Sequence, residues 1–395
     1  MMKPPEKKRL YVLTEGYPNG QNLAGVFHRD QLHLLSQHGF DITVIGPTPW
    51  VPPGFASIRH RWKEYADLPA EEQDGALRIL RPRYLTMPRE NRIGLVDIFQ
   101  SIAVRALQLP APDALLAFFA IPLGAVARRL ASTWMVPYLV GMLGDDVNIY
   151  PHLNPRYARL LKEVLRDAAC AFANGPTLAK TAEALTGQPV RSLSIGVSAD
   201  RFRNLPSKAE ARRQLGLPQD RYLALYVGAL TRTKGMEEYL RAMTLLQHHS
   251  LLGVCVGTGP YYDRLAAAPN IRCLGMRPAA EVAMAMAASD ILVHPSHYEG
   301  LPTVLVEAAL AGLPILTTDA PGCIDMAEGG CARHVPVGNA DALASELELA
   351  LGNPEIDVAY ARSMAAKVNS EYRLDINTTT LAQLIHASIP DTATR

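Results

Sequence analysis

The sequence lacks a charge excess of either sign. Its 395 residues carry 39 Lys+Arg against 38 Asp+Glu, a net charge of +1, whereas a general nucleic-acid binder is strongly basic. It also lacks internal repeats and low-complexity runs. The hydrophobic fraction of 48% lies in the globular range. We therefore expect a folded protein that does not bind nucleic acid, with about two domains at roughly 100–200 residues each.

Cysteine pairs at metal or redox spacing are also missing. The five cysteines are odd in number and form no Cys-x-x-Cys pair, so we expect buried, reduced thiols rather than disulfides. Reduced thiols predict a reducing compartment, most simply the cytoplasm. The five are Cys170, Cys255, Cys273, Cys323 and Cys331.

Long hydrophobic runs do not occur. The basic N-terminus is followed by an apolar stretch over residues 10–13 only, too short for a signal-peptide core of about 7–15 residues. The longest apolar run, residues 114–127, is interrupted by Pro122 and falls short of the roughly 20 residues of a spanning helix. We expect a protein that spans no membrane and lies in the cytoplasm or at the inner face of the membrane.

Short apolar runs alternate with amphipathic segments along most of the chain. This alternation is typical of α/β proteins whose mainly parallel sheets are covered on both faces. The predicted strands are 10–14, 41–45, 114–118, 137–140, 169–173, 222–227, 251–256, 271–274, 291–294 and 314–317. The predicted helices are 27–37, 96–107, 156–166, 176–185, 234–246, 279–288, 303–311 and 340–351. Residues 46–95, rich in Pro and Arg, are predicted to form an excursion from the first sheet.

The strand–helix pattern restarts after about residue 205, behind the polar stretch 204–208. We predict an α/β protein with two doubly wound, Rossmann-like domains that face each other across a cleft. The first domain is predicted to cover residues 1–200 and the second residues 201–365, with 366–395 a helical segment that packs back on the first. Ligands of such sheets bind outside the carboxyl ends of the strands.

The strongest chemical signal is the segment 294–307. A predicted buried strand ends at His294, and Pro302 is placed to open a helix, because proline suits a first helical position. The start of that helix offers an anion site. Glu299 in the loop and Glu307 in the helix could bind different hydroxyl pairs of one long ligand. The structural alternative is a capping acid and a solvated helical glutamate.

A second signal is the segment 226–235, again a strand, a glycine-containing loop and a helix. Lys234 stands at the predicted helix start, where the helix dipole disfavours a free cation. A bound diphosphate would explain it, and a solvated lysine remains the alternative. The Gly-x-Gly at Gly257 has no third glycine and no acidic partner at dinucleotide spacing, so it does not indicate a dehydrogenase.

Together these segments resemble the family 4 retaining glycosyltransferases, the glycosyl transferases group 1, which have the B-type glycosyltransferase fold. The resemblance covers nearly all of residues 10–350. The matching residues are Tyr17-Pro18, Gly25-Val-Phe27, Gln31, Gly144-Asp-Asp146, Gly196-Val197, Phe202, Gly228, Lys234-Gly235, Val256-Gly-Thr-Gly-Pro260, Leu274-Gly275, Ser289-Asp290, Pro295-Ser296, Glu299-Gly300, Glu307-Ala308 and Gly312-Leu-Pro314.

The resemblance implies that the second domain binds a nucleotide-sugar donor, UDP- or GDP-linked. Lys234 would contact the diphosphate, Glu307 the ribose and Glu299 the transferred hexose-type sugar. The other implied donor-binding residues are Gly228, Arg232, Gly257, Met276, Arg277, Gly300, Leu301, Pro302 and Thr303, of which Met276 and Arg277 would lie beside the base.

The resemblance also implies that the first domain binds the acceptor, a glycan, a lipid-linked sugar or a small molecule. The acceptor side would be the loop with Asn22 and Gly25 together with the segment around Asp146. Glu299, Lys234 and Asp146 are the implied catalytic residues. Transfer would retain the anomeric configuration, with the leaving diphosphate helping to take the acceptor proton. No cofactor and no metal is expected, and the oligomeric state is not predicted.

Two positions depart from the family pattern. Many relatives have Arg after the glycine matched by Gly228, where this chain has Ala229, and His before Gly144, where it has Leu143. A non-catalytic nucleotide-sugar binder and a nucleotide-sugar 2-epimerase of the same fold are therefore the alternatives. The histidines show no metal-ligand spacing, and Asp145-Asp146 is not expected to bind metal, because the acidic metal motif belongs to the other glycosyltransferase fold.

The near-zero net charge conceals a difference between the two halves. Up to residue 197 the chain has 22 Lys+Arg against 17 Asp+Glu, and after it 17 against 21. Residues 59–92 are rich in arginine and carry eight of these 22 basic residues, against six acidic ones. This stretch either contacts an anionic lipid-linked acceptor or a membrane surface, or consists of ordinary surface arginines.

Overall fold

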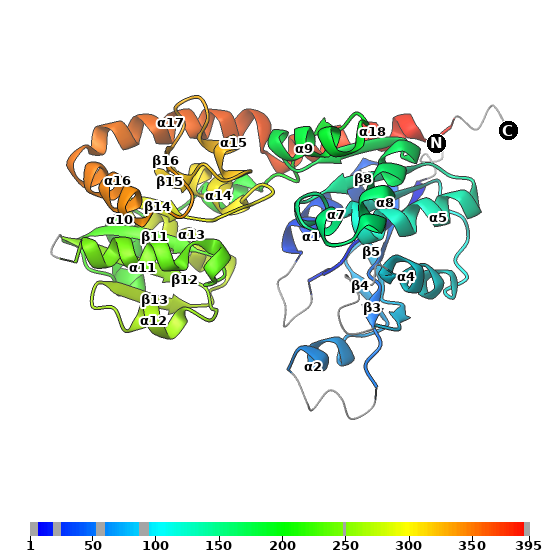
Figure 1. Ribbon diagram of the computed structural model, residues 1–395, viewed down its shortest axis with the longest axis horizontal. Helices are drawn as coiled ribbons and strands as arrows, with labels where there is room; N and C mark the ends of the chain where they lie inside the picture. Colours follow the sequence, from blue (N-terminus) through cyan, green and yellow to red (C-terminus); the bar gives the residue numbers. More distant parts are fainter. Residues whose placement is uncertain (1–6, 19–24, 53–59, 87–94, 248–249, 391–395) are drawn as a thin grey trace, which may run out of the picture. The chain divides into compact units, whose positions relative to one another are not determined.

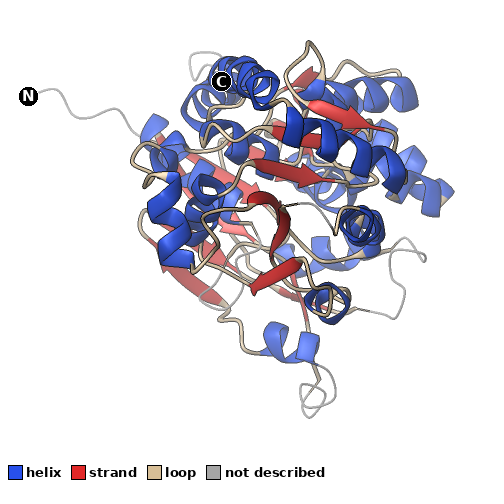
Figure 2. Cartoon of the chain, turned by 90° about the vertical axis from the view of Figure 1, so that its left-hand side faces the viewer, coloured by secondary structure: helices blue, strands red, loops and turns tan. Residues whose placement is uncertain are grey.

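The computed structural model describes residues 7–18, 25–52, 60–86, 95–247 and 250–390. The chain forms two compact units. Unit 1 comprises Met1–Ile195 and Asp375–Arg395, and unit 2 comprises Gly196–Leu374. The sequence placed the divisions after residues 200 and 365. Helices (blue) lie on both faces of the strands (red) in Figure 2, and the prediction of two doubly wound α/β units is confirmed.

Unit 1 contains an eight-stranded sheet in the order β10-β9-β8-β7-β1-β2-β5-β4. All neighbouring strands pair in parallel except β4 and β5. Its strands are β1 (Lys8–Leu13), β2 (Phe40–Ile45), β4 (Glu71–Asp74), β5 (Leu77–Leu80), β7 (Ala114–Phe118), β8 (Tyr138–Met142), β9 (Cys170–Ala173) and β10 (Arg191–Ser192). A separate two-stranded ribbon joins β3 (Thr48–Pro49) to β6 (Arg83–Tyr84).

The helices of unit 1 have apolar faces that pack on this sheet. In α8, the buried side chains Tyr157, Leu160, Leu161, Val164 and Leu165 follow helical spacing, and each such burial contributes about 1.5–3 kcal/mol. The helices are α1 (Val26–Leu35), η1 (Ser36–His38), α2 (His60–Ala66), α4 (Val96–Arg105), η3 (Ala120–Gly124), α5 (Ala125–Trp134), α6 (Asp145–Asn148), α7 (Tyr150–Leu153), α8 (Pro155–Asp167), α9 (Pro176–Thr186) and α18 (Leu374–Ser388).

The segment 46–95 differs from its prediction as an excursion. Within it, β5 pairs in parallel with β2, and β4 folds back on β5 as an antiparallel edge strand. This part of the chain therefore extends the first sheet. The sequence concealed these strands because β4 is polar and half-exposed and because the apolar run of β5 is interrupted by Arg78 and followed by the Arg-Pro-Arg stretch 81–83.

Unit 2 contains a six-stranded parallel sheet in the order β13-β12-β11-β14-β15-β16. Its strands are β11 (Tyr222–Val227), β12 (Leu251–Val256), β13 (Ile271–Gly275), β14 (Ile291–His294), β15 (Ile315–Thr318) and β16 (Arg333–Val335). Its helices are η4 (Ala199–Phe202), α10 (Lys208–Leu215), η5 (Arg232–Lys234), α11 (Met236–Leu245), α12 (Tyr262–Ala266), α13 (Ala279–Ala288), α14 (Thr303–Leu310), α15 (Cys323–Ala327), α16 (Ala340–Gly352) and α17 (Pro354–Glu371). Figure 1 labels most of these elements.

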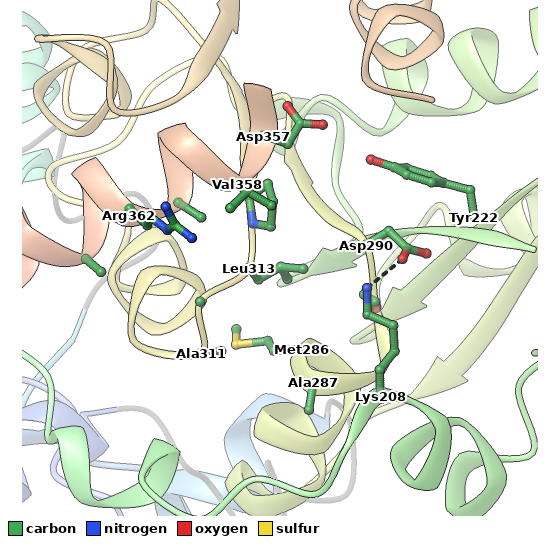
Figure 3. A pocket seen from close by; sticks show the side chains of 15 residues that line it. Lys208, Tyr222, Met286, Ala287, Asp290, Ala311, Leu313, Asp357, Val358 and Arg362 are labelled. Carbon is green, nitrogen blue, oxygen red and sulfur yellow. Dashed lines mark hydrogen bonds and ion pairs between the residues drawn. The ribbon is translucent and has the colours of Figure 1, made fainter. Parts of the chain in front are cut away.

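A cavity of about 390 Å³ lies at the amino-terminal edge of this sheet, where Tyr222, Asp290 and Pro314 precede or begin strands. Figure 3 shows Lys208 and Asp290 paired at one side of it and Arg362 at the other. None of the predicted donor-binding residues lines this cavity. It therefore lies at the edge opposite the one where the carboxyl ends of the strands meet.

Asp290 is the anchor of this amino-terminal edge. Its carboxylate accepts hydrogen bonds from Arg212 Nη2 at 2.6 Å, Lys208 Nζ at 2.8 Å and the Leu223 backbone N–H at 2.7 Å. The Arg212 side chain is only 6% exposed. Asp290 thus joins α10 to the start of β11 and supplies the counter-charge of a buried guanidinium.

In the described part of the chain, no helix is both long and apolar enough to cross a membrane. The five cysteines are free thiols, and Cys255, Cys323 and Cys331 are buried.

Replacing Asp290 with alanine should destabilise unit 2 by about 3–5 kcal/mol, because it leaves the Arg212 charge buried and uncompensated. Urea unfolding followed by far-UV circular dichroism measures the loss. The tryptophans Trp50, Trp62 and Trp134 all lie in unit 1, so their fluorescence follows that unit separately. Asp341→Ala, which removes an exposed ion pair with Arg241, is the control and should cost less than about 1 kcal/mol. Equal losses in both variants would contradict the anchoring role of Asp290.

Candidate active site

Most of the predicted donor-binding residues of unit 2 follow the carboxyl ends of its strands. Gly228 follows β11, Gly257 follows β12, Met276 follows β13, and the segment 295–303 follows β14. Because parallel strands end at one edge, the fold brings these positions together along the chain of adjacent strands β13-β12-β11-β14.

The loops at this edge are joined backbone to backbone. A Cβ atom on Gly257 would lie 1.9 Å from the Gly228 carbonyl oxygen, and one on Gly235 would lie 1.9 Å from that of Pro295. The His297 backbone N–H donates to the Thr233 carbonyl at 3.0 Å. The loop that carries Lys234 is therefore fixed to the loop that carries Glu299.

Glu299 is the centre of the donor-side cluster. Its Oε1 atom lies 2.5 Å from Lys234 Nζ and 3.0 Å from His294 Nε2. The side chains of Glu299 and Lys234 are 14% and 30% exposed. Burial by itself raises the pKa of Glu299, but the hydrogen bond and charge of His294 and the charge of Lys234 outweigh it and lower that pKa to about 2.

The lowered pKa determines what Glu299 can do. Since it lies below the ordinary value of 4.5, the ion pairing of Glu299 stabilises the fold fully above about pH 4.5 and is lost as the pH falls through about 2. At neutral pH Glu299 is therefore a carboxylate. It can accept hydrogen bonds from sugar hydroxyls but has no proton to donate.

His294 is a member of this cluster that the sequence did not assign to it. Its ring is buried and stacks on Tyr226, with the centroids 6.2 Å apart and the planes at 7°. Because a carboxylate only accepts, the Nε2 atom that faces Glu299 must be the donor nitrogen. His294 lies at the end of β14 and Glu299 lies five residues later in the loop. No sequence motif links two residues in this arrangement, so the contact could not be predicted.

Glu307 is buried in the second turn of α14 and forms an ion pair with Arg201. Arg201 Nη1 lies 3.6 Å from Glu307 Oε1. Burial raises the pKa of Glu307, and the charge of Arg201 opposes that rise. Arg201 was not among the sequence-predicted site residues, because it precedes unit 2's first strand and has no spacing relation to Glu307.

The helix α14 begins at Thr303, as in the predicted range 303–311, but Pro302 is not its first helical residue. Pro302 is the N-cap, with extended φ and ψ of −73° and 104°, and Thr303 is the first helical residue. The helix therefore presents the N–H groups of Thr303 and Val304 at its start, where an anion is stabilised by the dipole, whereas the Leu305 N–H donates to the Pro302 carbonyl at 3.0 Å. Gly300 and Leu301 lie in the loop just before it.

The remaining predicted donor residues lie at the same edge with more exposed side chains. Arg232 is exposed and shares the short helix η5 with Lys234. Met276 is 72% exposed. Arg277 donates to the Leu274 carbonyl at 2.9 Å and pairs with Glu281 at 3.0 Å. An exposed methionine beside a fixed guanidinium is suited to a flat, polar ring such as a base.

In unit 1, Gly25 is the N-cap of α1, and Asn22 lies outside the described residues. Gly25 has a φ of 83°, and a Cβ there would lie 1.8 Å from the Gly16 carbonyl oxygen. The start of α1 is thereby held against the first residues of the loop that follows β1. The predicted acceptor role of this loop stays a prediction.

Asp146 is fully buried, and its carboxylate is occupied by backbone. Oδ2 accepts from the Ala120 N–H at 2.7 Å, and Oδ1 accepts from the N–H groups of Leu143 at 3.1 Å and Gly144 at 3.0 Å. Burial raises the pKa of Asp146 to about 6, against the lowering effect of these hydrogen bonds. Asp146 thus joins the loops after β7 and β8, and its predicted contact with the acceptor stays a prediction.

Within the described ranges, no group of three or more His, Cys, Asp or Glu side chains could hold a metal ion.

The family model described as "Glycosyl transferases group 1" matches residues 207–367. A Bacillus subtilis (strain 168) protein named as a teichuronic acid biosynthesis glycosyltransferase, TuaC, is 33% identical over 322 residues, which cover 80% of this chain and 82% of TuaC.

Two solved structures show the fold. Sucrose-phosphate synthase from Thermosynechococcus elongatus superposes with a TM-score of 0.79 at 19% identity, over 96% of this chain and 99% of that one. Anabaena HepE in complex with UDP-glucose superposes with a TM-score of 0.69 at 16% identity, over 96% and 100%. The predicted B-type glycosyltransferase fold is thereby confirmed.

Replacing Asp146 with asparagine should destabilise unit 1 by about 1–3 kcal/mol, since the amide NH₂ leaves at least one buried backbone N–H without an acceptor. Urea unfolding followed by tryptophan fluorescence measures this, with the exposed neighbour Asp145→Asn as the control. A variant with unchanged stability but abolished activity would show instead that Asp146 acts on the substrate.

Proposed function

The chain belongs to the glycosyl transferases group 1 family, and on that premise we propose that it is a retaining hexosyltransferase. The donor is a UDP- or GDP-linked sugar, and the acceptor is a hydroxyl of a glycan, a lipid-linked sugar or a small molecule. The observation that carries the proposal is the cluster at the carboxyl edge of unit 2, in which Lys234 and His294 share one oxygen of the ionised Glu299.

Each part of the donor is assigned to a different group at the carboxyl edge of unit 2. Lys234 and the start of α14 lie where a diphosphate would be stabilised by a cation and by free N–H groups. Glu307, deeper in α14, takes the ribose diol, and Glu299 takes hydroxyls of the transferred sugar. Met276 and Arg277, at the end of β13, lie at the base.

Lys234 can pair either with Glu299 or with the diphosphate of a bound donor. Without donor it pairs with Glu299. A bound diphosphate carries more negative charge than one carboxylate, so we propose that Lys234 turns to it and that His294 continues to hold Glu299. As the anomeric bond breaks, Lys234 offsets the charge that develops on the leaving diphosphate. The chemistry then depends on positioning and leaving-group stabilisation, without a metal ion.

A glycan is the acceptor class to test first, because TuaC is named for teichuronic acid biosynthesis. UDP-glucose is the first donor to test, because the HepE structure is described as a complex with it. Transfer is measured as nucleotide release that depends on the acceptor, and NMR of the product gives the anomeric configuration.

Release that needs no acceptor would favour a 2-epimerase, and tight donor binding without turnover would favour a non-catalytic binder. Transfer abolished by EDTA and restored by Mn²⁺ would contradict the metal-free mechanism.

Replacing Lys234 with alanine should lower kcat more than a hundredfold, about 3 kcal/mol of transition-state stabilisation, if its charge acts on the leaving group. Steady-state kinetics with saturating donor measures the effect. Lys208→Ala, which removes a lysine at the opposite edge of the same sheet, is the matched control and should keep kcat within a few-fold of wild type. A Lys234 variant with normal kcat would place the diphosphate elsewhere.

Replacing Glu307 with alanine should weaken donor binding by about 1–3 kcal/mol, because a hydrogen-bonded charged partner of the ribose is lost. Isothermal titration calorimetry with the nucleoside diphosphate measures the change, and circular dichroism checks that unit 2 is folded. Unchanged affinity in the folded variant would show that Glu307 does not bind the ribose.

A further inference from the structure

Glu307 pairs with a residue that lies far from it in the chain. Arg201 Nη1 and Glu307 Oε1 are 3.6 Å apart, and the two side chains are 26% and 11% exposed. At this distance the contact is an ion pair rather than a hydrogen bond. The carboxylate oxygens therefore keep their capacity to accept hydrogen bonds from a ligand while a positive charge stands beside them.

Apart from Arg201 of η4, the charged groups on the shorter elements packed against α14 pair with residues other than Glu307. The helix α14 contacts η4, α17, β14 and β15. His294 of β14 faces Glu299, and the residues of β15 are not titratable. In η4, the exposed Asp200 pairs with Arg203. Glu307 is itself the one charged residue of α14.

The charged side chains of α17 also have partners other than Glu307 or are exposed. Asp357 pairs with Arg333 at 2.7 Å, Lys367 donates to the Asp325 carbonyl oxygen, and Arg362 lines the cavity at the amino-terminal edge. The acidic Glu355 and Glu371 are exposed. Among the described residues, Arg201 is therefore the charge that can hold Glu307 ionised. Burial raises the pKa of Glu307, and Arg201 opposes this rise.

The backbone that carries Arg201 is fixed at the point where the chain enters unit 2. Val197 N–H donates to the Tyr372 carbonyl at 3.0 Å, and Leu374 N–H donates to the Val197 carbonyl at 3.2 Å. The Ser198 hydroxyl caps η4 by accepting from the Asp200 N–H, and Phe202 is buried. Arg201 thus projects from a short helix that is anchored on both sides.

We propose that Arg201 is a positioning residue for nucleotide binding that acts through Glu307, and that it thereby sets the preference of the site for a ribose over a 2′-deoxyribose. The proposal rests on the proposed function, in which Glu307 accepts hydrogen bonds from the ribose diol. A carboxylate accepts from both hydroxyls of a diol, whereas a protonated or displaced carboxyl accepts less strongly.

The test is calorimetric titration of the full-length chain with UDP and GDP and with the 2′-deoxy form of whichever binds. Arg201→Ala should weaken binding of the ribonucleotide about tenfold to a hundredfold and binding of the deoxynucleotide much less. The loss should be larger near pH 5.5 than near pH 8, because Glu307 takes up a proton more readily once the neighbouring charge is gone. Arg201→Lys should restore most of the preference.

Two further variants separate this role from a structural one. Arg203→Ala removes an exposed arginine just beyond the same short helix and should bind like wild type. Glu307→Gln and the double variant Glu307→Gln/Arg201→Ala should bind with equal affinity, since Arg201 acts through Glu307.

Three results would overturn the inference while leaving the proposed function intact. They are an unchanged ribose preference in Arg201→Ala, an equal loss in Arg203→Ala, and additive losses in the double variant. A wild-type chain that binds neither nucleotide would overturn both the proposed function and this inference.

Discussion

The candidate active site depends on how closely the backbones at one edge of unit 2 approach each other. At Gly235 and Gly257 a single added carbon atom would lie within 2 Å of a neighbouring carbonyl oxygen, a distance that no non-bonded pair adopts. This contact joins the loops after β11, β12 and β14 into one layer. Lys234, His294 and Glu299 can meet at distances of 2.5–3.0 Å because the loops that carry them cannot move apart independently.

Two carboxylates in the chain, Asp146 fully buried and Glu299 largely buried, show how the surroundings determine the role of the same chemical group. Glu299 is surrounded by a lysine and a histidine, and its pKa falls to about 2. Asp146 is surrounded by backbone N–H groups alone, and burial raises its pKa to about 6. The N–H dipoles around Asp146 did not offset the cost of removing its carboxylate from water, whereas the charged partners of Glu299 did so for that carboxylate. Glu299 is therefore suited to binding a ligand, and Asp146 to holding two loops together.

The sequence predicted the helices and strands that have a clear hydrophobic periodicity and are connected by short loops. All ten predicted strands and the carboxyl-edge location of Lys234, Glu299 and Glu307 agree with the structure to within a few residues. It did not predict β4 and β5, because β4 is polar and the apolar run of β5 is interrupted by Arg78. It also did not predict the contacts of Glu299 with His294 and of Glu307 with Arg201, because such contacts arise from tertiary packing and have no spacing rule.

The helix α18 has a consequence for how the protein is made. Leu381, Ala382 and Ile385 of α18 belong to the same buried cluster as Leu10, Val12 and Phe40 of the first strands. Unit 2 is thus inserted into unit 1, and the ribosome must complete all of unit 2 before it supplies the residues that close the first core. Unit 2 can fold while synthesis continues, but unit 1 exposes one apolar face until the end. During translation the N-terminal half therefore lacks part of its core until α18 has been synthesised.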